Sequence, residues 1–336
     1  MSKRKPNMII IQRPNQTRRK ELALTMGFFD GVHLGHRELI QTVAHDAEIM
    51  GLESAVLTFW PHPRLVLHKD PEKLRFLNTL NEKAKIIAKF GIDYFIVQEF
   101  AKDFFNLDAT DFITLLVNEY KVKHFVIGAD HRFGKGGTGD SNLLNKLSGE
   151  MGFTIKVVPS QKIDGVDVSS TKIREALLSG NLKLANQMLG YPYLITGAVQ
   201  SGNQLGRKIG FPTANIRPND PLKLIPKEGV YAVIVNANDT IYKGMLNIGF
   251  RPTIDTTNKQ SIEVNIFDFE NDLYNAGIEV ALVSRLRDEK RFPSIEHLKE
   301  QLVIDKQNAL EALKDEKVER YQNLFLTLRP ERNNNQ

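Results

Sequence analysis

Residues 21–36 read ELALTMGFFDGVHLGH, a stretch in which a β-strand is expected to end and an α-helix to begin. The strand is predicted over ELALTMGF (21–28), and Gly27 and Gly31 allow other groups to approach the backbone of the turn closely. The helix is predicted from Arg37 onward, where apolar residues recur at helical spacing. A helix N-terminus presents free N–H groups and a positive dipole end, so the turn predicts an anion site.

The remainder of the first half alternates strand and helix signals. Further strands are predicted over residues 54–59, 93–100, 124–130 and 153–159. Helices are predicted between them, and one of these opens with a capping box formed by Thr79 and Glu82. Strands that alternate with helices of this length imply a mostly parallel sheet with right-handed crossovers, whose ligands bind beyond the carboxyl ends of the strands. The first half is therefore predicted to be an α/β domain.

Short strand-like segments separated by Gly, Asn and Asp turns dominate the second half. About five or six such strands suit a small closed antiparallel barrel. A charged helical segment is predicted from Ser294 onward. Gly190 and Pro192 stop the helix that precedes the barrel, so we expect one domain over residues 1–188 and another over residues 189–330.

The composition excludes several classes of protein. At 336 residues, with 41% hydrophobic and 25% charged residues, the chain has the composition of a soluble globular protein of two domains. The absence of cysteine excludes disulfides and thiolate metal sites, and it fits a reducing cytosol. No apolar run approaches the length that spans a bilayer, and MSKRKPNMII at the N-terminus does not resemble a cleaved signal. We therefore expect a cytoplasmic protein with no membrane partner.

The charged residues give a net charge of +5 with both signs well mixed. This charge suits anionic ligands such as nucleotides, and a mixed solvated surface explains it equally well. The basic clusters SKRK at residues 2–5 and RPNQTRRK at residues 13–20 are expected to be a mobile end and a loop. We expect no nucleic-acid partner, and a monomer or weak homo-oligomer.

His33 and His36 are candidate phosphate ligands. They lie three residues apart at the opening turn of the predicted helix, so both rings can point at the same phosphates. Metal binding is the alternative, but two histidines without a third ligand nearby disfavour zinc. The position of the pair at a helix start favours phosphate binding.

VSSTKIR at residues 168–174 is a second candidate phosphate site. Ser169, Ser170 and Thr171 can cap a helix and donate hydrogen bonds to phosphate oxygens. Arg174 supplies a fixed positive charge. Alone this pattern is weak, because any helix N-cap with basic residues looks similar.

GRKIGFPTAN at residues 206–215 is a candidate ATP site in the second half. Pro212 fixes the backbone, while the Thr213 hydroxyl and the Asn215 amide oxygen are hard oxygen ligands suited to Mg²⁺ on an ATP phosphate. The short basic loop before them can approach the triphosphate, although the sequence of a P-loop is absent. Its phosphate-binding residues are expected to be Arg207, Lys208 and Gly210.

Glu263 lies in IEVNIFDF, a strand whose other residues are built to be half-buried. A carboxylate at this position is either solvent-facing by alternation or functional. Alternation alone favours the solvent-facing interpretation.

GFFDGVHLGH (27–36) combined with SSTKIR (169–174) resembles the HxGH nucleotidyltransferase superfamily, which has a Rossmann-like parallel sheet. The resemblance implies that a nucleotide α-phosphate is attacked and that pyrophosphate leaves without a covalent enzyme intermediate. It also implies that His33, His36 and Arg174 stabilise the charge that moves onto pyrophosphate, with Mg²⁺ assisting. The phosphates of ATP are expected to lie against Gly27, Phe28, Asp30, Ser170 and Thr171.

FWPHPRLVL (59–67) and IGADHRFGKGG (127–137) resemble the FMN adenylyltransferase module of bacterial flavin synthetases. Asp130 stands at the family's Asn/Asp position, whereas His131 replaces a common aromatic residue and Phe28 replaces a small polar one. The resemblance implies that the flavin contacts Pro61, Pro63 and Asp130.

GFPTAN, MLNIGFRPT, IEVNIFDFENDLY and RLRDEKRF occur in the order seen in riboflavin kinases. By this resemblance Glu263 is the general base that takes the proton from the ribityl 5′-hydroxyl as it attacks the ATP γ-phosphate. RLRDEKRF (285–292) is expected to form a flap in which Arg287 and Phe292 contact the flavin, and a charged turn is the alternative. Asn265 replaces the family's usual histidine, which we expect to alter packing more than catalysis.

From about Lys20 to Tyr321 the chain therefore resembles the prokaryotic bifunctional riboflavin kinase/FMN adenylyltransferases. The resemblance implies that the barrel makes FMN from riboflavin and ATP, and that the α/β domain makes FAD from FMN and a second ATP. The expected ligands are riboflavin, FMN and ATP, with Mg²⁺. The alternatives are another adenylyl- or cytidylyltransferase, an RNA-linked enzyme and a non-catalytic flavin sensor or regulator.

Overall fold

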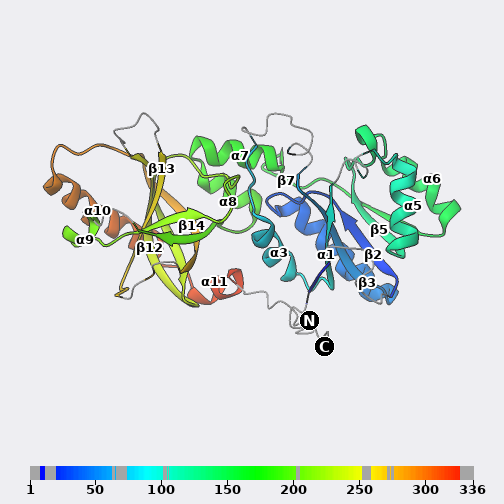
Figure 1. Cartoon of the computed structure of the whole chain (residues 1–336), viewed down its shortest axis with the longest axis horizontal. Coiled ribbons are helices and arrows are strands. Elements are labelled where there is room, and N and C mark those ends of the chain that lie inside the picture. The colour runs from blue at the N-terminus through cyan, green and yellow to red at the C-terminus, as the bar shows by residue number, and fades with distance from the viewer. Residues whose placement is uncertain are drawn as a thin grey trace. The chain divides into compact units, whose positions relative to one another are not determined.

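The computed structural model (Figure 1) groups the described chain into two compact units. The described residues are 8–11, 20–62, 65, 74–100, 104, 106–201, 205–251, 259–270, 273 and 276–325. Those up to Leu74, together with Lys83–Val168, form the α/β unit. Arg75–Glu82 and the described residues from Ser169 onward form the barrel unit.

The α/β unit is built on a sheet in which all strand pairs are parallel. The order across the sheet is β1 (Ile9–Ile11), β4 (Tyr94–Glu99), β3 (Glu53–Trp60), β2 (Leu22–Met26), β5 (Val122–Gly128) and β6 (Thr154–Val158). The chain runs from β2 through β3 to β4 in one direction and continues with β5 and β6 on the other side of β2. The order therefore reverses at β2, where open parallel sheets bind their ligands.

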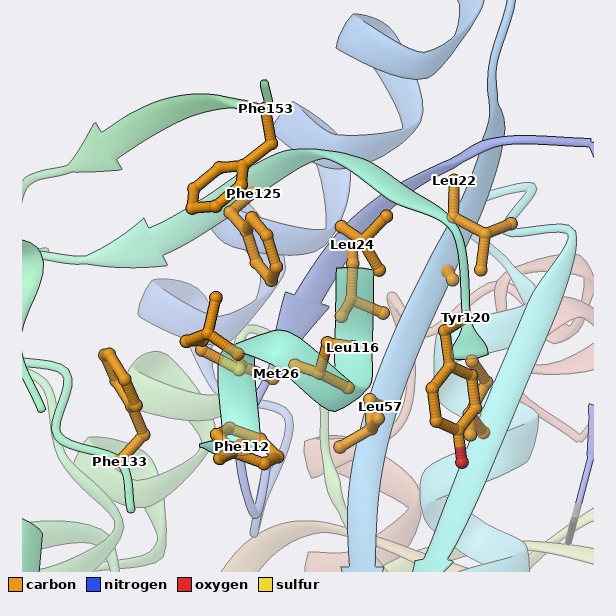
Figure 2. Packing of buried hydrophobic residues seen from close by; sticks show 14 of the residues in the cluster. Leu22, Leu24, Met26, Leu57, Phe112, Leu116, Tyr120, Phe125, Phe133 and Phe153 are labelled. Atoms are coloured by element: carbon orange, nitrogen blue, oxygen red, sulfur yellow. The ribbon is translucent and has the colours of Figure 1, made fainter. Parts of the chain in front are cut away.

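Helices connect these strands and bury them. They are α1 (Leu34–Met50), α3 (Leu80–Ala88), α5 (Ala109–Glu119), η3 (Lys135–Gly137) and α6 (Ser141–Met151). All five residues of β2 are buried, as expected for a central parallel strand covered on both faces. The close-up of Figure 2 shows the core on one face, where Leu24 and Met26 pack with Phe112 and Leu116 of α5.

The barrel unit contains antiparallel strands that close on themselves. Their order is β10 (Ala214–Pro218), β13 (Lys259–Ile266), β12 (Thr240–Arg251), β11 (Gly229–Ala237), β14 (Gly277–Arg287) and β9 (Tyr193–Gln200), which pairs again with β10. The unit's helices are α7 (Ser170–Ser179), α8 (Leu182–Leu189), α9 (Leu205–Lys208), α10 (Ile295–Ala312) and α11 (Val318–Leu324). α10 contacts β11, β12 and β14. The hairpin β7 (Lys162–Ile163) and β8 (Val166–Asp167) belongs to the α/β unit.

This architecture confirms the predicted fold class, a parallel α/β unit followed by an antiparallel barrel with helices. The capping box is also confirmed, because Thr79 N–H donates to Glu82 Oε2 at 2.9 Å and Glu82 N–H donates to Thr79 Oγ1 at 3.2 Å. By contacts, α7 and α8 belong to the barrel unit. The domain limits 1–188 and 189–330 stay a prediction.

A buried ion pair fixes the segment Arg75–Glu82 within the barrel unit. Lys223 Nζ lies 2.6 Å from Glu82 Oε2, and both side chains are at most 1% exposed. Glu82 Oε1 also accepts from the Thr196 hydroxyl at 2.9 Å, and Lys223 donates to the carbonyl of Leu77 at 2.6 Å. Removing one member of such a pair strands a buried charge, at a cost of about 3–5 kcal/mol.

No helix in the described part of the chain is long and apolar enough to cross a membrane.

Candidate active sites

The turn between β2 and α1 contains unfavourable backbone conformations, which the packing of its side chains must stabilise. Gly31 has φ 84°, and the non-glycine residues Phe29 (φ 47°) and Val32 (φ 36°) also lie in the left-handed region. Each such residue costs on the order of 1–3 kcal/mol, so the surrounding structure must impose it. Both side chains are buried, at 2% and 0% exposure, which supplies that constraint. The turn is therefore rigidly shaped before any ligand arrives.

His33 and His36 lie together at the start of α1. Their rings are stacked, with centroids 3.6 Å apart and an interplanar angle of 18°. His33 is the N-cap of α1, and its Nδ1 accepts from the His36 N–H at 3.4 Å. A neutral His33 then carries its proton on Nε2. Among the described residues, the buried Nδ1 of His36 has no hydrogen-bond partner.

Both imidazoles are neutral at pH 7. Burial lowers the pKa of His33 to about 4, although the negative charges of Asp30 and Asp130 act in the opposite direction. Burial lowers the pKa of His36 well below its usual value, and repulsion from Lys83, and from His33 when that ring is protonated, lowers it further. The pair can therefore donate N–H hydrogen bonds to phosphate oxygens, but it brings no charge of its own to the site.

Lys83 on α3 is a residue that sequence reasoning missed. Its ammonium donates to the Phe28 carbonyl and lies 3.4 Å from the Thr58 hydroxyl oxygen. Burial lowers the pKa of Lys83 to about 8, with the charge of Asp30 opposing that shift. One signal was available, because Lys83 stands one helical turn before the apolar pair Ile86 and Ile87 and so shares their face.

The ends of β3 and β5 flank this turn, since both strands pair with β2. Pro61 follows β3 and is half-buried, and Asp130 follows β5 and is exposed. The ring of Phe28, 38% exposed, lies 4.8 Å from that of His62 and 5.5 Å from that of Phe59, measured between centroids. Gly27 opens the turn and Asp30 is buried in it. Pro63 lies outside the described residues.

His131 carries a third depressed histidine pKa, which burial lowers to about 4 against the opposing charge of Asp130. Its ring stacks on Phe133 with centroids 6.1 Å apart. The imidazole in this position thus packs against Phe133 as an aromatic ring.

The SSTKIR segment opens α7 in the barrel unit. Of the three residues expected to cap this helix, Ser169 is the N-cap, and its hydroxyl accepts from the Lys172 N–H at 3.4 Å. Ser170 and Thr171 occupy the first turn, and Arg174 donates from Nε to the Arg75 carbonyl at 3.1 Å. The helix start is therefore formed, while its contact with phosphate stays a prediction.

In the barrel, three of the predicted kinase residues come together. Thr213 Oγ1 lies 3.3 Å from Glu263 Oε2. Asn215 on β10 is the register partner of Glu263 on β13, and Asn247 on β12 is its partner on the other side. Asn247 lies in the quoted MLNIGFRPT, but only the strand register reveals that it neighbours Glu263.

The loop that precedes Thr213 is held by two local features. Asn265, which we expected to affect packing, is buried, and its Nδ2 donates to the Pro212 carbonyl at 2.7 Å. This hydrogen bond positions the loop. A side chain at Gly206 would place Cβ 2.2 Å from the Phe211 carbonyl oxygen, which explains the glycine. Arg207 is exposed and Gly210 has φ 86°, whereas the side chain of Lys208 lies outside the described residues.

The predicted flap residues Arg287 and Phe292 lie close to each other, with the guanidinium carbon 5.8 Å from the ring centroid. Arg287 also forms a bidentate ion pair with Asp305 of α10, at 2.8 and 2.6 Å. Asp305 is buried, so this pair ties the end of β14 to α10. Whether either residue contacts flavin stays a prediction.

Comparison with known proteins identifies the class. The sequence model of the FAD synthetase family matches residues 15–172, and that of the riboflavin kinase family matches residues 189–313. The fold and the two matches define an ATP-dependent transferase with two catalytic domains. The chain belongs to the family of bifunctional riboflavin kinase/FMN adenylyltransferases, as its curated relatives show.

Two of the relatives that bear this name illustrate the similarity. The protein of Bacillus subtilis (strain 168) is 39% identical over 310 residues, which cover 90% of this chain and 96% of the relative. The protein of Escherichia coli (strain K12) is 40% identical over 301 residues, covering 88% and 94%. A crystal structure described as a macrolide-efflux protein from Streptococcus pneumoniae is 30% identical, with a TM-score of 0.81 and coverage of 90% and 98%.

The chain therefore phosphorylates riboflavin to FMN and transfers the adenylyl group of ATP to FMN, and its substrates are riboflavin, FMN and ATP. The two enzymatic families in this order favour this function over another nucleotidyltransferase, an RNA-linked enzyme or a flavin sensor.

Proposed function

We propose that Glu263 is the general base of the riboflavin kinase step. The grouping of Glu263 with Thr213 and Asn215 supports this assignment, because it places a carboxylate next to the residues that we expect to bind ATP and Mg²⁺. Glu263 would take the proton of the ribityl 5′-hydroxyl while that oxygen forms its bond to the γ-phosphorus and the bond to ADP breaks.

Thr213 and Asn215 would hold Mg²⁺. A hydroxyl and an amide oxygen beside a carboxylate form a hard-oxygen donor set, which fits this ion. When bound, Mg²⁺ neutralises charge on the ATP phosphates. Arg207, Lys208 and Gly210 would contact those phosphates from the loop.

For adenylyl transfer, an oxygen of the FMN phosphate attacks the α-phosphorus of ATP and pyrophosphate leaves. His33 and His36 would donate hydrogen bonds to the phosphate oxygens as neutral imidazoles, a role that their lowered pKa values support. The fixed positive charge would come from Arg174, as the SSTKIR motif implies. The turn and α7 would contribute further phosphate contacts through Gly27, Phe28, Asp30, Ser170 and Thr171.

The flavin ring would contact Pro61, Pro63 and Asp130 in the adenylyl-transfer site, and Arg287 and Phe292 in the kinase site. The position of Pro61 and Asp130 at the ends of strands that neighbour β2 supports the first group. We further propose that the enzyme acts in the cytoplasm, as a monomer or weak homo-oligomer, on small molecules rather than nucleic acid or membranes.

A product assay on the full chain tests these assignments. Purified protein is incubated with riboflavin, ATP and Mg²⁺, and FMN and FAD are separated by chromatography. Parallel reactions that start from FMN isolate the adenylyl-transfer step. The assignments require that substitutions at Glu263 and at His36 block different steps.

A further inference from the structure

The described part of the α/β unit contains a buried ammonium, that of Lys83. Only 7% of this residue is exposed, and its helical neighbours Ala84, Ile86 and Ile87 form a buried apolar face. An ammonium in such surroundings is costly unless polar groups compensate it. A lysine is therefore placed here for its contacts and not for packing.

The contacts of Lys83 converge on one carbonyl. Its ammonium donates to the carbonyl oxygen of Phe28, and the hydroxyl of Thr58 donates to the same oxygen at 3.3 Å. Lys83 Nζ and Thr58 Oγ1 are themselves 3.4 Å apart. Helix α3 and strand β3 thus each place a donor on a single backbone atom of the turn.

That atom lies in the turn, between two residues with positive φ. Phe28 stands between Gly27 (φ 159°) and Phe29 (φ 47°), and the turn continues to the cap residue His33. Because Phe29 has an unfavourable backbone conformation, a fixed carbonyl immediately before it stabilises the whole turn. The position of the histidine pair depends on this turn.

The ammonium also acts through its charge. The negative charge of Asp30 in the turn raises the pKa of Lys83, and the positive charge of Lys83 lowers that of His36 in α1. His36 in turn stacks on His33, whose pKa the charges of Asp30 and Asp130 raise. A positive charge at Lys83 disfavours a proton on His36 and balances the buried carboxylate of Asp30.

We propose that Lys83 is a positioning residue for adenylyl transfer, whose ammonium fixes the Phe28 carbonyl and thereby the turn that presents His33 and His36. The inference rests on the proposed role of these histidines. Since the pKa of Lys83 is about 8, the ammonium is present below that pH and is lost as the pH rises through it.

The test measures FAD formation from FMN and ATP between pH 6 and 9.5. Lys83→Met should lower the rate by roughly 10²-fold, the scale of a small misplacement of reacting groups. In the native enzyme the rate should fall as the pH rises through about 8. In Lys83→Arg this alkaline fall should move to higher pH, because a guanidinium stays protonated. Lys85→Met, on the same helix but half-buried, is the matched control.

Riboflavin kinase activity of the same preparations reports whether each variant folds. Full FAD formation by Lys83→Met, or an alkaline fall that stays near pH 8 in Lys83→Arg, would overturn the proposal. If Lys83→Met loses both activities, the proposal is judged by comparing the pH profiles of FAD formation in the native enzyme and in Lys83→Arg. A labelled-histidine NMR titration adds a readout that a packing role would not move, since the pKa of His36 should rise in Lys83→Met.

His36→Ala separates this proposal from the site assignment. Full FAD formation in both His36→Ala and Lys83→Met would refute the assigned site. Loss in His36→Ala with full activity in Lys83→Met would refute the role of Lys83 alone.

Discussion

The hydroxyl of Thr213 lies 3.3 Å from a carboxylate oxygen of Glu263, although 50 positions separate the two residues in the chain. Strand β13 brings them together, because Glu263 is the register partner of Asn215, which follows Thr213 closely in sequence. Alternation along the strand alone favoured a solvent-facing carboxylate. Closure of the barrel leaves this carboxylate half-buried and places it beside Thr213 and Asn215, where we propose that it acts on the substrate hydroxyl.

Glu263→Gln should lower FMN formation by roughly 10²-fold or more, the scale of a lost general base. The amide is nearly isosteric but cannot take the hydroxyl proton. The rate is measured with riboflavin, ATP and Mg²⁺, and FAD formation from added FMN should continue. Glu270→Gln, at an exposed position, is the control. A Glu263→Gln enzyme with the native rate would remove this residue from the mechanism.

His36→Ala should reduce FAD formation by roughly 10²-fold or more, as expected when a hydrogen-bond donor to a transition state is lost. FMN formation by the barrel should be spared. Arg174→Ala should have the same selectivity. His45→Ala changes an exposed histidine of the same helix α1 and should affect neither activity. Loss of both activities in His36→Ala would contradict the separation of the two sites.

Stability of the α/β unit should fall as the pH drops from about 6.5 to about 4. The pKa of His33 is about 4 in the folded chain, below its ordinary value, so the unfolded chain binds more protons in this interval. In His33→Gln, the fall in the free energy of unfolding over this pH interval should be smaller by up to about 3 kcal/mol. Urea unfolding followed by fluorescence of Trp60, the chain's single tryptophan and the last residue of β3, measures it.

The control for this measurement is His45→Gln, which should keep the pH dependence of the native chain because its side chain is exposed. An equal pH dependence in His33→Gln and the native chain would show that His33 is protonated similarly in both states.

Lys223→Met should destabilise the barrel unit by about 3–5 kcal/mol, because Glu82 is left buried without its partner. Adding Glu82→Gln should restore part of the loss by removing the stranded charge. The effect is measured as the urea concentration at which half of the riboflavin kinase activity is lost. Lys227→Met breaks an exposed pair with Asp288 and should leave the midpoint nearly unchanged. Equal midpoints for Lys223→Met and Lys227→Met would show that the buried pair contributes little.

Features that depend on neighbouring residues were readable from the sequence. The strand and turn of residues 21–36, the helix that follows them, the capping box of Thr79 and Glu82, and the helix from Ser294 onward each use hydrogen bonds or periodicity within a few positions. The first helix begins at Leu34, three residues before the predicted start. The alternation of strands and helices, followed by short strands alone, likewise predicted both folds.

The tertiary structure alone decided which distant groups meet. It buried Lys83 against the Phe28 carbonyl, paired Arg287 with Asp305, and set Asn247 opposite Glu263. No local pattern specifies these contacts, because strand register and helix packing depend on the core as a whole. Burial then moved the histidine pKa values, since the cost of a charge depends on the atoms that replace water around it. The sequence by itself therefore determined the elements and the residue types of both sites, whereas only the assembled structure determined their charges and partners.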